Sequence, residues 1–369
     1  MRTQLWSLSA FVFLLWANSA SWAATEVVFA QIADFSGRGK GISIPFGEGA
    51  KACIRAHNLG NPRKPVRLTQ ADDHFIPAES STHAREAIQN GVIAVLGSLG
   101  GETSRAIADV TDTAGLPVVG AISGATSLRA EQRRSLFYLR ASIEQEAVAA
   151  IKHFASINAQ RIGILHTNDA YGKDAAQAAG RYAATVNLPE LKTHAYNAGT
   201  TDAAQAAKGF QDFDGVVVFG SGQMLFNFVS SMRETSKATT IIAASSANME
   251  ALVTAIGITK ARGVGYLRSL PSPSTKSSLG RSFLQIWKAQ GSNAAPGPFH
   301  LEGCLAAQIA LSALMSIEGD VSSQTLLRAL KGKSPYQFSE FAVDFRNASN
   351  EGMSWVGIAV VDANGLLRD

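Results

Sequence analysis

The chain has 369 residues, of which 46% are hydrophobic and 17% are charged, and its formal net charge is +4 at pH 7. This composition is typical of a well-packed globular protein and argues against a disordered one. The positive excess is small and the clusters of lysine and arginine are short, so we do not expect nucleic-acid binding. The length is too great for one ordinary core and suits two lobes of about 150 residues each.

The first 23 residues have the order of features of a secretory signal peptide. Arg2 supplies a positive start, an apolar run follows from Leu5 to Trp16, and Ser21 and Ala23 place small residues where a signal peptidase cleaves. The run is too short to cross a membrane. We therefore expect a cleaved signal at residues 1–23 and an exported, soluble mature chain that begins near Ala24, without direct insertion into the membrane.

Cys53 and Cys304 are the two cysteines of the chain. Each falls in a helical pattern, at residues 47–58 and 301–317, so each could be a small buried hydrophobic residue. A disulfide is the alternative, and it requires that the fold bring the two helices together. The sequence leaves both alternatives open.

Short apolar runs alternate with helical patterns along the chain, and small hydrogen-bonding residues follow each run. The runs lie at Val27–Ala33, 92–96, 116–119, 161–166, 216–219 and 241–244. Such runs are typical of buried parallel strands, and ligands of parallel sheets bind beyond the carboxyl ends of the strands. The pattern predicts an α/β protein with doubly wound parallel sheets and a binding cleft.

In chain order, the elements form two βα series and a mixed tail. Between the first four runs we expect helices at 47–59, 77–90 and 102–114 and a strand at 66–72. The second series starts with a helix at 142–155, capped by Ser142, and continues with helices at about 202–210 and 224–235. The tail predicts a strand at 264–270, helices at 276–290, 301–317 and 325–330, and strands at 341–345 and 355–362.

Six short motifs occur in an order that resembles a known family. They are Asp34-Phe35-Ser36-Gly37, Asp72-Asp73, Val95-Leu96-Gly97-Ser98, Leu116-Pro117-Val118-Val119, Asp169-Ala170-Tyr171-Gly172 and Gly199-Thr200-Thr201-Asp202. Together they resemble the type I periplasmic binding proteins of the leucine/isoleucine/valine-binding class, which are solute receptors of ABC importers. The resemblance runs from about residue 26 to the C-terminus. Residues 301–303 and 349–352 are similar to a less characterised branch of that class.

The resemblance implies two lobes that are joined by three crossovers and close on a ligand by a hinge motion. We place the crossovers near residues 140–142, 262–265 and 336–341. Lobe 1 then comprises residues 24–141 and 264–336, and lobe 2 comprises residues 142–263 and 337–369. The resemblance also implies a periplasmic location.

The same resemblance implies ligand-site residues in both lobes. The loop with Gly101, Glu102 and Thr103 opens a helix, whose free N–H groups attract an anion. A second loop contributes Ile122, Ser123 and Gly124, and Tyr171 contacts the ligand from the second lobe. The full set of predicted site residues is Phe35, Ser98, Gly101, Glu102, Thr103, Ile122, Ser123, Gly124, Tyr171, Gln223, Ser245 and Ser246.

The sequence departs from the amino-acid receptors of the family where an acid pairs with a ligand ammonium. That acid would fall at Ser245 or Ser246, and neither can carry a charge. An unpaired buried ammonium is costly, so a standard aliphatic amino acid is not expected unless Glu102 or Asp169 substitutes. Gly101 also lacks the hydroxyl of those receptors, and Gln223 stands where they place an aromatic side chain. We expect a neutral, apolar or carboxylate ligand.

Motifs for catalysis and cofactors do not assemble in the sequence. The glycine-rich segment 37–41 lacks the spacing of nucleotide-binding loops, and no nucleophile elbow occurs. The histidines and cysteines have no zinc-site spacing. The pair Asp72-Asp73 before His74 has no partner for acid/base chemistry. We therefore predict a binding protein without a cofactor or metal rather than an enzyme.

These features allow three interpretations of the function. The leading interpretation is a receptor that passes its small-molecule ligand to the permease subunits of an ABC importer. The alternative is a sensor that presents its closed form to a chemoreceptor or to a histidine kinase. A secreted α/β hydrolase is a remote third interpretation, because a nucleophile, its base and an orienting group do not occur together.

Overall fold

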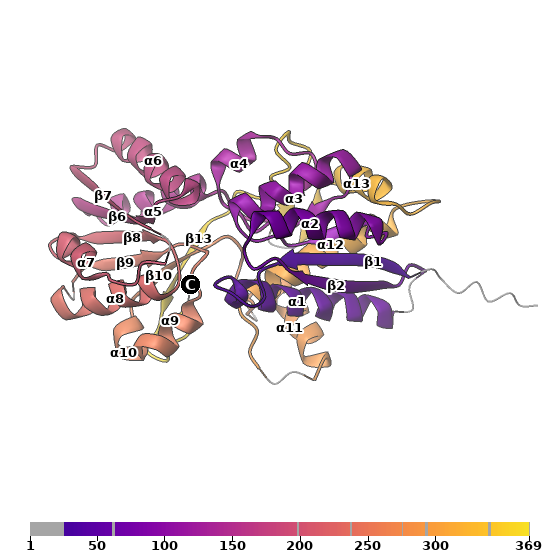
Figure 1. The fold of residues 1–369 in the computed structure, drawn as a ribbon. Coiled ribbons are helices and arrows are strands. Elements are labelled where there is room, and N and C mark those ends of the chain that lie inside the picture. Colours follow the sequence, from indigo (N-terminus) through magenta and orange to yellow (C-terminus); the bar gives the residue numbers. More distant parts are fainter. Residues whose placement is uncertain are drawn as a thin grey trace, which may run out of the picture.

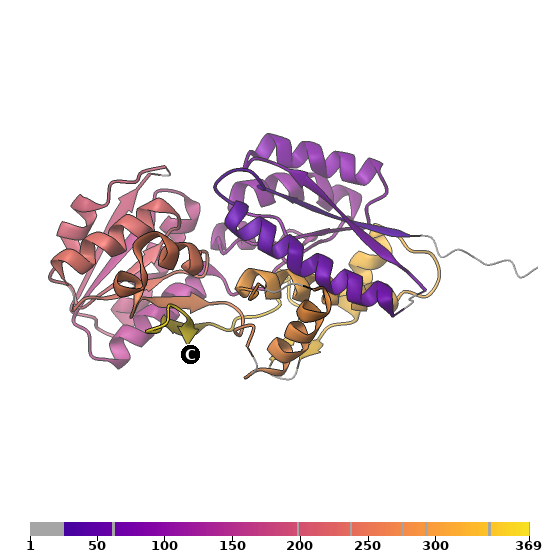
Figure 2. The same ribbon diagram turned by 90° about the horizontal axis from the view of Figure 1, so that it is seen from below.

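The computed structural model describes residues 26–60, 63–197, 199–236, 238–274, 276–291, 294–338 and 341–368. The predicted signal peptide at residues 1–23 lies outside the described residues. Within the described ranges, no helix combines the length and the apolar character that a membrane span needs. Figures 1 and 2 show two lobes side by side, each built on its own sheet.

The first lobe is a parallel sheet of five strands in the order β2-β1-β3-β4-β5. Its strands are β1 (Val27–Ala33), β2 (Val66–Asp72), β3 (Ala94–Leu96), β4 (Val118–Val119) and β5 (Leu136–Phe137). Its helices are α1 (Lys40–Leu59), α2 (Pro77–Gln89), α3 (Gly101–Ala114), α4 (Thr126–Ala130), α11 (Ser278–Ala289), α12 (Pro298–Met315) and α13 (Ser323–Gly332). A hairpin of β11 (Tyr336–Phe338) and β12 (Phe341–Val343) follows them.

Alternate residues of β1 pack on opposite faces of this sheet. Phe29 joins the core that α1 and α12 cover, whereas Ala30 and Ile32 join the core that α2 and α3 cover. Burial on both faces explains why the strand is an unbroken apolar run rather than an alternating one. The doubly wound α/β fold that the sequence predicted is confirmed.

The second lobe has seven strands in the order β14-β13-β10-β9-β8-β6-β7. Its strands are β6 (Arg161–Thr167), β7 (Glu190–Tyr196), β8 (Gly215–Phe219), β9 (Thr240–Ala243), β10 (Gly265–Arg268), β13 (Gly357–Val361) and β14 (Leu367–Arg368). Its helices are α5 (Ile143–Ser156), α6 (Ala170–Thr185), α7 (Ala204–Phe210), α8 (Gln223–Thr235), α9 (Met249–Ile256) and α10 (Ile258–Ala261). The strands β6 to β10 pair in parallel, whereas β13 and β14 pair antiparallel.

The lobe boundaries differ from the predicted ones in two places. Residues 264–268 do not belong to lobe 1, because β10 pairs with β9 and β13 in the second sheet. It continues the second βα series through α9 and α10, so the crossover follows this strand instead of preceding it. The segment after residue 336 does not lie wholly in lobe 2, because Val343, Phe345 and Met353 are buried in the first-lobe core.

Helix α1 begins at Lys40, seven residues before the predicted start, and takes in part of the glycine-rich segment. Pro45 lies within the helix and has no N–H to donate to the carbonyl of Gly41, four residues earlier. The free carbonyl of Gly41 faces the second lobe, where the side-chain amide of Asn248 donates to it over 3.3 Å.

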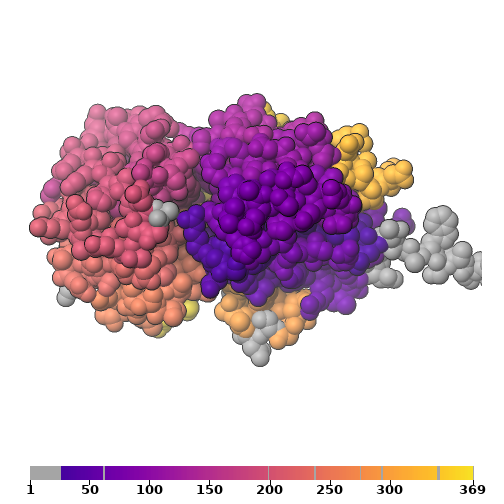
Figure 3. All heavy atoms as spheres, in the orientation of Figure 1, coloured from indigo at the N-terminus to yellow at the C-terminus, as the bar shows by residue number. Residues whose placement is uncertain are grey.

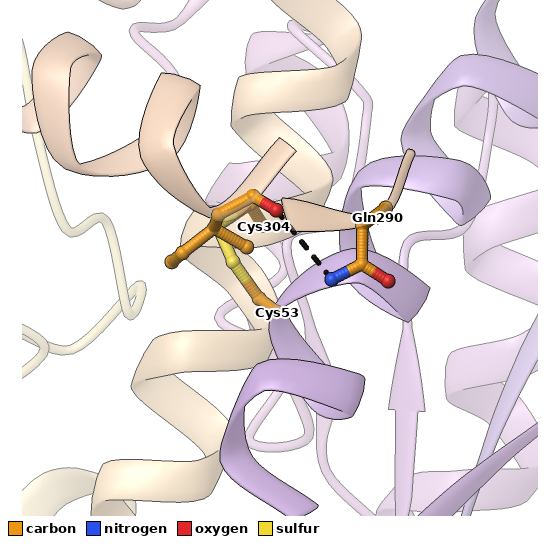
Figure 4. Close-up of a disulfide and its surroundings, with 4 residues drawn as sticks. Cys53, Gln290 and Cys304 are labelled. Atoms are coloured by element: carbon orange, nitrogen blue, oxygen red, sulfur yellow. Dashed lines mark hydrogen bonds between the residues drawn. A yellow bond between two sulfur atoms is a disulfide. The ribbon is translucent and has the colours of Figure 1, made fainter. Parts of the chain in front are cut away.

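Cys53 and Cys304 form a disulfide between α1 and α12, and both are buried in the first-lobe core. Figure 4 shows the bridge with Gln290, at the end of α11, beside it. The two helices come from opposite ends of the sequence, 251 residues apart, so the bond closes a long loop. The fold decides between the two alternatives that the sequence left open.

Replacing both cysteines in Cys53→Ala/Cys304→Ala should lower the free energy of unfolding by about 2–4 kcal/mol, because the bridge restricts the unfolded chain. Chemical denaturation followed by circular dichroism measures the loss. A reductant should destabilise the wild type to a similar extent and leave the double variant unchanged. Equal stability of the variant and the oxidised wild type would contradict the prediction.

Candidate functional site

The loops after β3 and β4 lie side by side at the carboxyl edge of the first sheet. Ile122 donates its N–H to the carbonyl of Ser98 over 2.7 Å, and Gly100 donates to the carbonyl of Ile122 over 3.1 Å. The backbone of Gly100 has a φ of 96°, a conformation that favours glycine and opens α3. We call residues 98–104 the first contact loop and residues 122–124 the second contact loop.

The two contact loops meet closely at their glycines. A Cβ atom placed on Gly101 would lie 3.9 Å from Oγ of Ser123. Ser98 and Thr103 are buried, and their hydroxyls bond within the first contact loop: Ser98 pairs with Ser104 over 2.7 Å, and Thr103 donates to the carbonyl of Leu99. The groups of this loop that stay available to a ligand are therefore the N–H groups of the first turn of α3.

Tyr171 brings the second lobe to the same place. It stands in the first turn of α6, and its hydroxyl lies 3.0 Å from Oγ of Ser246, which follows β9. A Cβ atom placed on Gly124 would lie 3.4 Å from the ring carbon Cε2 of Tyr171, so the ring reaches the second contact loop of the first lobe. Burial raises the pKa of the Tyr171 phenol well above its usual value, which keeps the hydroxyl protonated.

The predicted acid substitutes Glu102 and Asp169 are both engaged elsewhere. The side chain of Glu102 is 68% exposed and pairs with Arg105 over 2.6 Å. Asp169 caps α6, accepting the N–H of Gly172 over 2.9 Å, and also accepts the hydroxyl of Thr167 over 2.8 Å. Both carboxylates have local structural partners.

One carboxylate that binds Ser245, that of Glu146, was not among the site residues predicted from the sequence. Glu146 of α5 is 1% exposed, and its two oxygens accept the hydroxyl of Ser245 over 2.5 Å and the N–H of Ser245 over 3.0 Å. Both oxygens are thus occupied by one residue of the protein. A signal for it does exist in the sequence: Glu146 sits at helical spacing from Ile143 and Ala150, on a face that should be apolar.

Two other predicted site residues make contacts of a different kind. Phe35 packs against the first-lobe core, and its N–H donates to Asp72 over 3.0 Å. Gln223 is exposed at the start of α8 and donates to Asn227 over 2.8 Å. The structure therefore brings together the contact loops, Tyr171, Ser245 and Ser246, whereas Phe35, the side chain of Glu102 and Gln223 have contacts of their own.

The two lobes touch on both sides of Tyr171. Besides the bond from Asn248 to Gly41, the N–H of Ser127 at the start of α4 donates to Asp174 of α6 over 3.0 Å. Figure 3 shows the lobes in contact along their junction. This is a closed arrangement, in which the contact loops face the second lobe.

The pair Asp72-Asp73 builds a turn beside the first contact loop. Asp72 accepts the N–H groups of Phe35 and His74, and the buried Asp73 accepts the hydroxyl of Ser80 over 2.7 Å. Burial raises the pKa of Asp73. Among the described residues, no group of three or more His, Cys, Asp or Glu side chains could hold a metal ion.

Comparison with known proteins agrees with this architecture. The model of the family described as periplasmic binding protein matches residues 26–365. No curated protein matches the sequence. Among solved structures, an extracellular ligand-binding receptor from Verminephrobacter eiseniae has a TM-score of 0.84 and 23% identity, with 93% of this chain and 100% of that chain covered.

Two similar structures contain a ligand. One is the branched-chain amino acid transporter substrate binding protein LivJ from Streptococcus pneumoniae in complex with isoleucine, with a TM-score of 0.82, 17% identity and coverage of 93% and 98%. The other is an ABC transporter solute binding protein from R. palustris in complex with benzoate, with a TM-score of 0.80, 13% identity and coverage of 93% and 95%. The family model spans nearly all of the described residues, so this chain belongs to the periplasmic binding protein family, and its fold is the type I, leucine/isoleucine/valine-binding-protein-like fold that its motifs predicted.

Proposed function

We propose that this protein is the exported solute receptor of an ABC importer, which traps a small ligand between its lobes in the periplasm and delivers it to the permease. The observation that carries the proposal is the position of Tyr171. It belongs to the second lobe, bonds Ser246 and packs against Gly124 of the first lobe. A small molecule at this place would touch contact residues from both lobes, and its binding would favour the closed form.

The comparisons support a small organic ligand for this class of fold. The similar structures from S. pneumoniae and R. palustris hold isoleucine and benzoate, and both are described as components of transporters. Both ligands carry a carboxylate, and only isoleucine carries an ammonium group. The first turn of α3 offers N–H groups that suit a carboxylate in this protein as well.

We infer further that the ligand lacks an ammonium group. Ser245 and Ser246 cannot pair with one, and Glu102 and Asp169 have partners of their own. Glu146 is 1% exposed, and its oxygens already bind the two donors of Ser245. An ammonium in the closed cleft would then lose its water without gaining a carboxylate. A neutral, apolar or carboxylate compound avoids this cost.

Native mass spectrometry of freshly purified mature protein tests the receptor function. We expect a mass excess that disappears on unfolding, with the released molecule able to rebind unchanged. Conversion of the released molecule into a product by fresh protein would instead indicate an enzyme and would overturn the proposal.

The ligand class is tested by pairs of compounds that differ in the ammonium alone. Leucine and 4-methylpentanoate have the same carbon skeleton, and calorimetry should show tighter binding of 4-methylpentanoate, since it brings no cation into the cleft. Leucine, isoleucine and valine should each bind more weakly than about 10 μM. Tighter binding of any of the three amino acids would refute this class.

The hydrogen bond from Asn248 to Gly41 should favour the closed form. Asn248 also caps α9, and the substitution Asn248→Asp removes the first role while keeping the second. The carboxylate keeps an oxygen for the N–H of Ala251, which caps α9 in the wild type, but it loses the donor to the Gly41 carbonyl. We expect a roughly fivefold lower ratio of closed to open molecules, the worth of about one hydrogen bond. Small-angle scattering should then give a larger radius of gyration.

Pro45→Ala is the complementary change. It supplies an N–H that can satisfy the Gly41 carbonyl within α1, so it should shift scattering in the same direction as Asn248→Asp. Scattering curves of both variants identical to that of the wild type would show that this bond does not hold the lobes together.

A further inference from the structure

A buried arginine lies in the crossover that follows β5. Arg140 donates through Nε and Nη2 to the two carboxylate oxygens of Glu302 in α12, over 3.0 Å and 2.6 Å. Their side chains are 4% and 3% exposed. Two parallel hydrogen bonds in a dry environment fix the guanidinium plane, because both partners would be costly to leave alone.

The third nitrogen of this guanidinium points to the second lobe. Nη1 of Arg140 donates to Oγ of Ser245 over 3.2 Å, and Ser245 in turn donates to Glu146. The carbonyl of Ser245 accepts the hydroxyl of Tyr266 over 2.9 Å. Because a guanidinium can only donate, the direction of the chain is fixed from Arg140 through Ser245 to Glu146. Every polar group of Ser245 is thereby occupied.

The same crossover is tied to the second contact loop of the first lobe. Nη2 of the buried Arg129 donates to the carbonyls of Ser123, Arg140 and Ala141, over 3.1, 2.9 and 3.2 Å. Ser123 and Ser245 are therefore linked. Arg129 binds the carbonyls of Ser123 and Arg140, and the side chain of Arg140 binds Ser245. Contact residues from the two lobes share one hydrogen-bonded support.

We propose that Arg140, Ser245 and Glu146 are positioning residues of the ligand site, which hold the segment at Ser246 in place so that Tyr171 lies against the second contact loop. This proposal builds on the proposed receptor function, but the experiment that tests it requires no ligand. The donor order requires a carboxylate at position 146, since that side chain must accept both the hydroxyl and the N–H of Ser245.

Glutamine at position 146 cannot replace the carboxylate. Its oxygen can accept one donor of Ser245, but its amide group then faces the other donor. In either orientation of the amide, one donor of Ser245, the hydroxyl or the N–H, would be left without an acceptor. Glu144 supplies a matched control: it lies on the same helix, is exposed and pairs with Arg181 over 2.9 Å.

Acid should loosen the same segment, because protonation also removes one acceptor at Glu146. Burial raises the pKa of Glu146, against the opposing effects of Ser245, Arg140 and Arg129. Tyr171, Tyr266 and Glu302 face the same cluster. Since the folded pKa is raised, the contribution of Glu146 to global stability is full at low pH and is lost as pH rises through that pKa. Local order and this stability contribution thus respond to pH in opposite directions.

The test is hydrogen exchange of residues 244–249 by mass spectrometry, without added ligand. Glu146→Gln should exchange roughly tenfold faster in this segment than the wild type, the loss of one charge-assisted hydrogen bond, while Glu144→Gln matches the wild type. Exchange of the wild type, corrected for its intrinsic rate, should also quicken as the pH falls through the raised pKa of Glu146, whereas Glu146→Gln should show no such change.

Unchanged exchange at residues 244–249 in Glu146→Gln would overturn the proposal. So would faster exchange throughout the second lobe together with a lower melting temperature, which would indicate a general structural role. If Glu146→Gln fails to fold, Ser245→Ala provides the test, because it removes the hydroxyl that links Arg140 to Glu146 and keeps both charged side chains. It should quicken exchange in the same segment alone, and protection equal to the wild type would refute the inference. Failure to find a ligand would not change the interpretation of these exchange measurements, because they are made without ligand.

Discussion

The charge of Arg140 has to be matched away from water, and much of the arrangement around the cleft follows from this constraint. Its partner Glu302 comes from the first lobe, whereas Ser245 and Glu146 come from the second. Breaking such a network leaves charges without compensation, so its members are satisfied only together. The crossover is therefore a hydrogen-bonded support at which the two lobes meet.

The contact loops gain their shape from the ends of parallel strands. Strand β3 and strand β4 finish side by side, and the loops that follow them bond to each other through Ser98, Gly100 and Ile122. Small residues let the loops approach each other and let the ring of Tyr171 approach Gly124. The hydroxyls of Ser98 and Thr103 bond within the first contact loop, so the site offers backbone N–H groups and the hydroxyls of Tyr171 and Ser246.

The contacts that hold the lobes closed are weaker than the buried network around Arg140. The lobes meet through single hydrogen bonds, from Asn248 to Gly41 and from Ser127 to Asp174. Single bonds of this kind contribute little net free energy, so a bound ligand can shift the balance between open and closed forms. A strong support and weak outer contacts together suit a protein that must close on its ligand and release it.

The sequence predicted what local pattern encodes and missed what depends on distant partners. Unbroken apolar runs such as Val27–Ala33 identified the parallel strands, because burial on both faces leaves that trace. The place of β10 depended on its pairing with β13, about 90 residues later, which no local pattern shows. Glu146 and Glu302 lie among buried apolar residues of their helices, and only the folded structure shows their partners Ser245 and Arg140.

A crystal structure of the mature protein as purified, with its retained molecule, tests the central claim most directly. The account predicts electron density for a small molecule between the lobes, in contact with Tyr171 and the two contact loops, and with no ammonium group. A molecule bound elsewhere, or lobes that stay apart around it, would contradict the account.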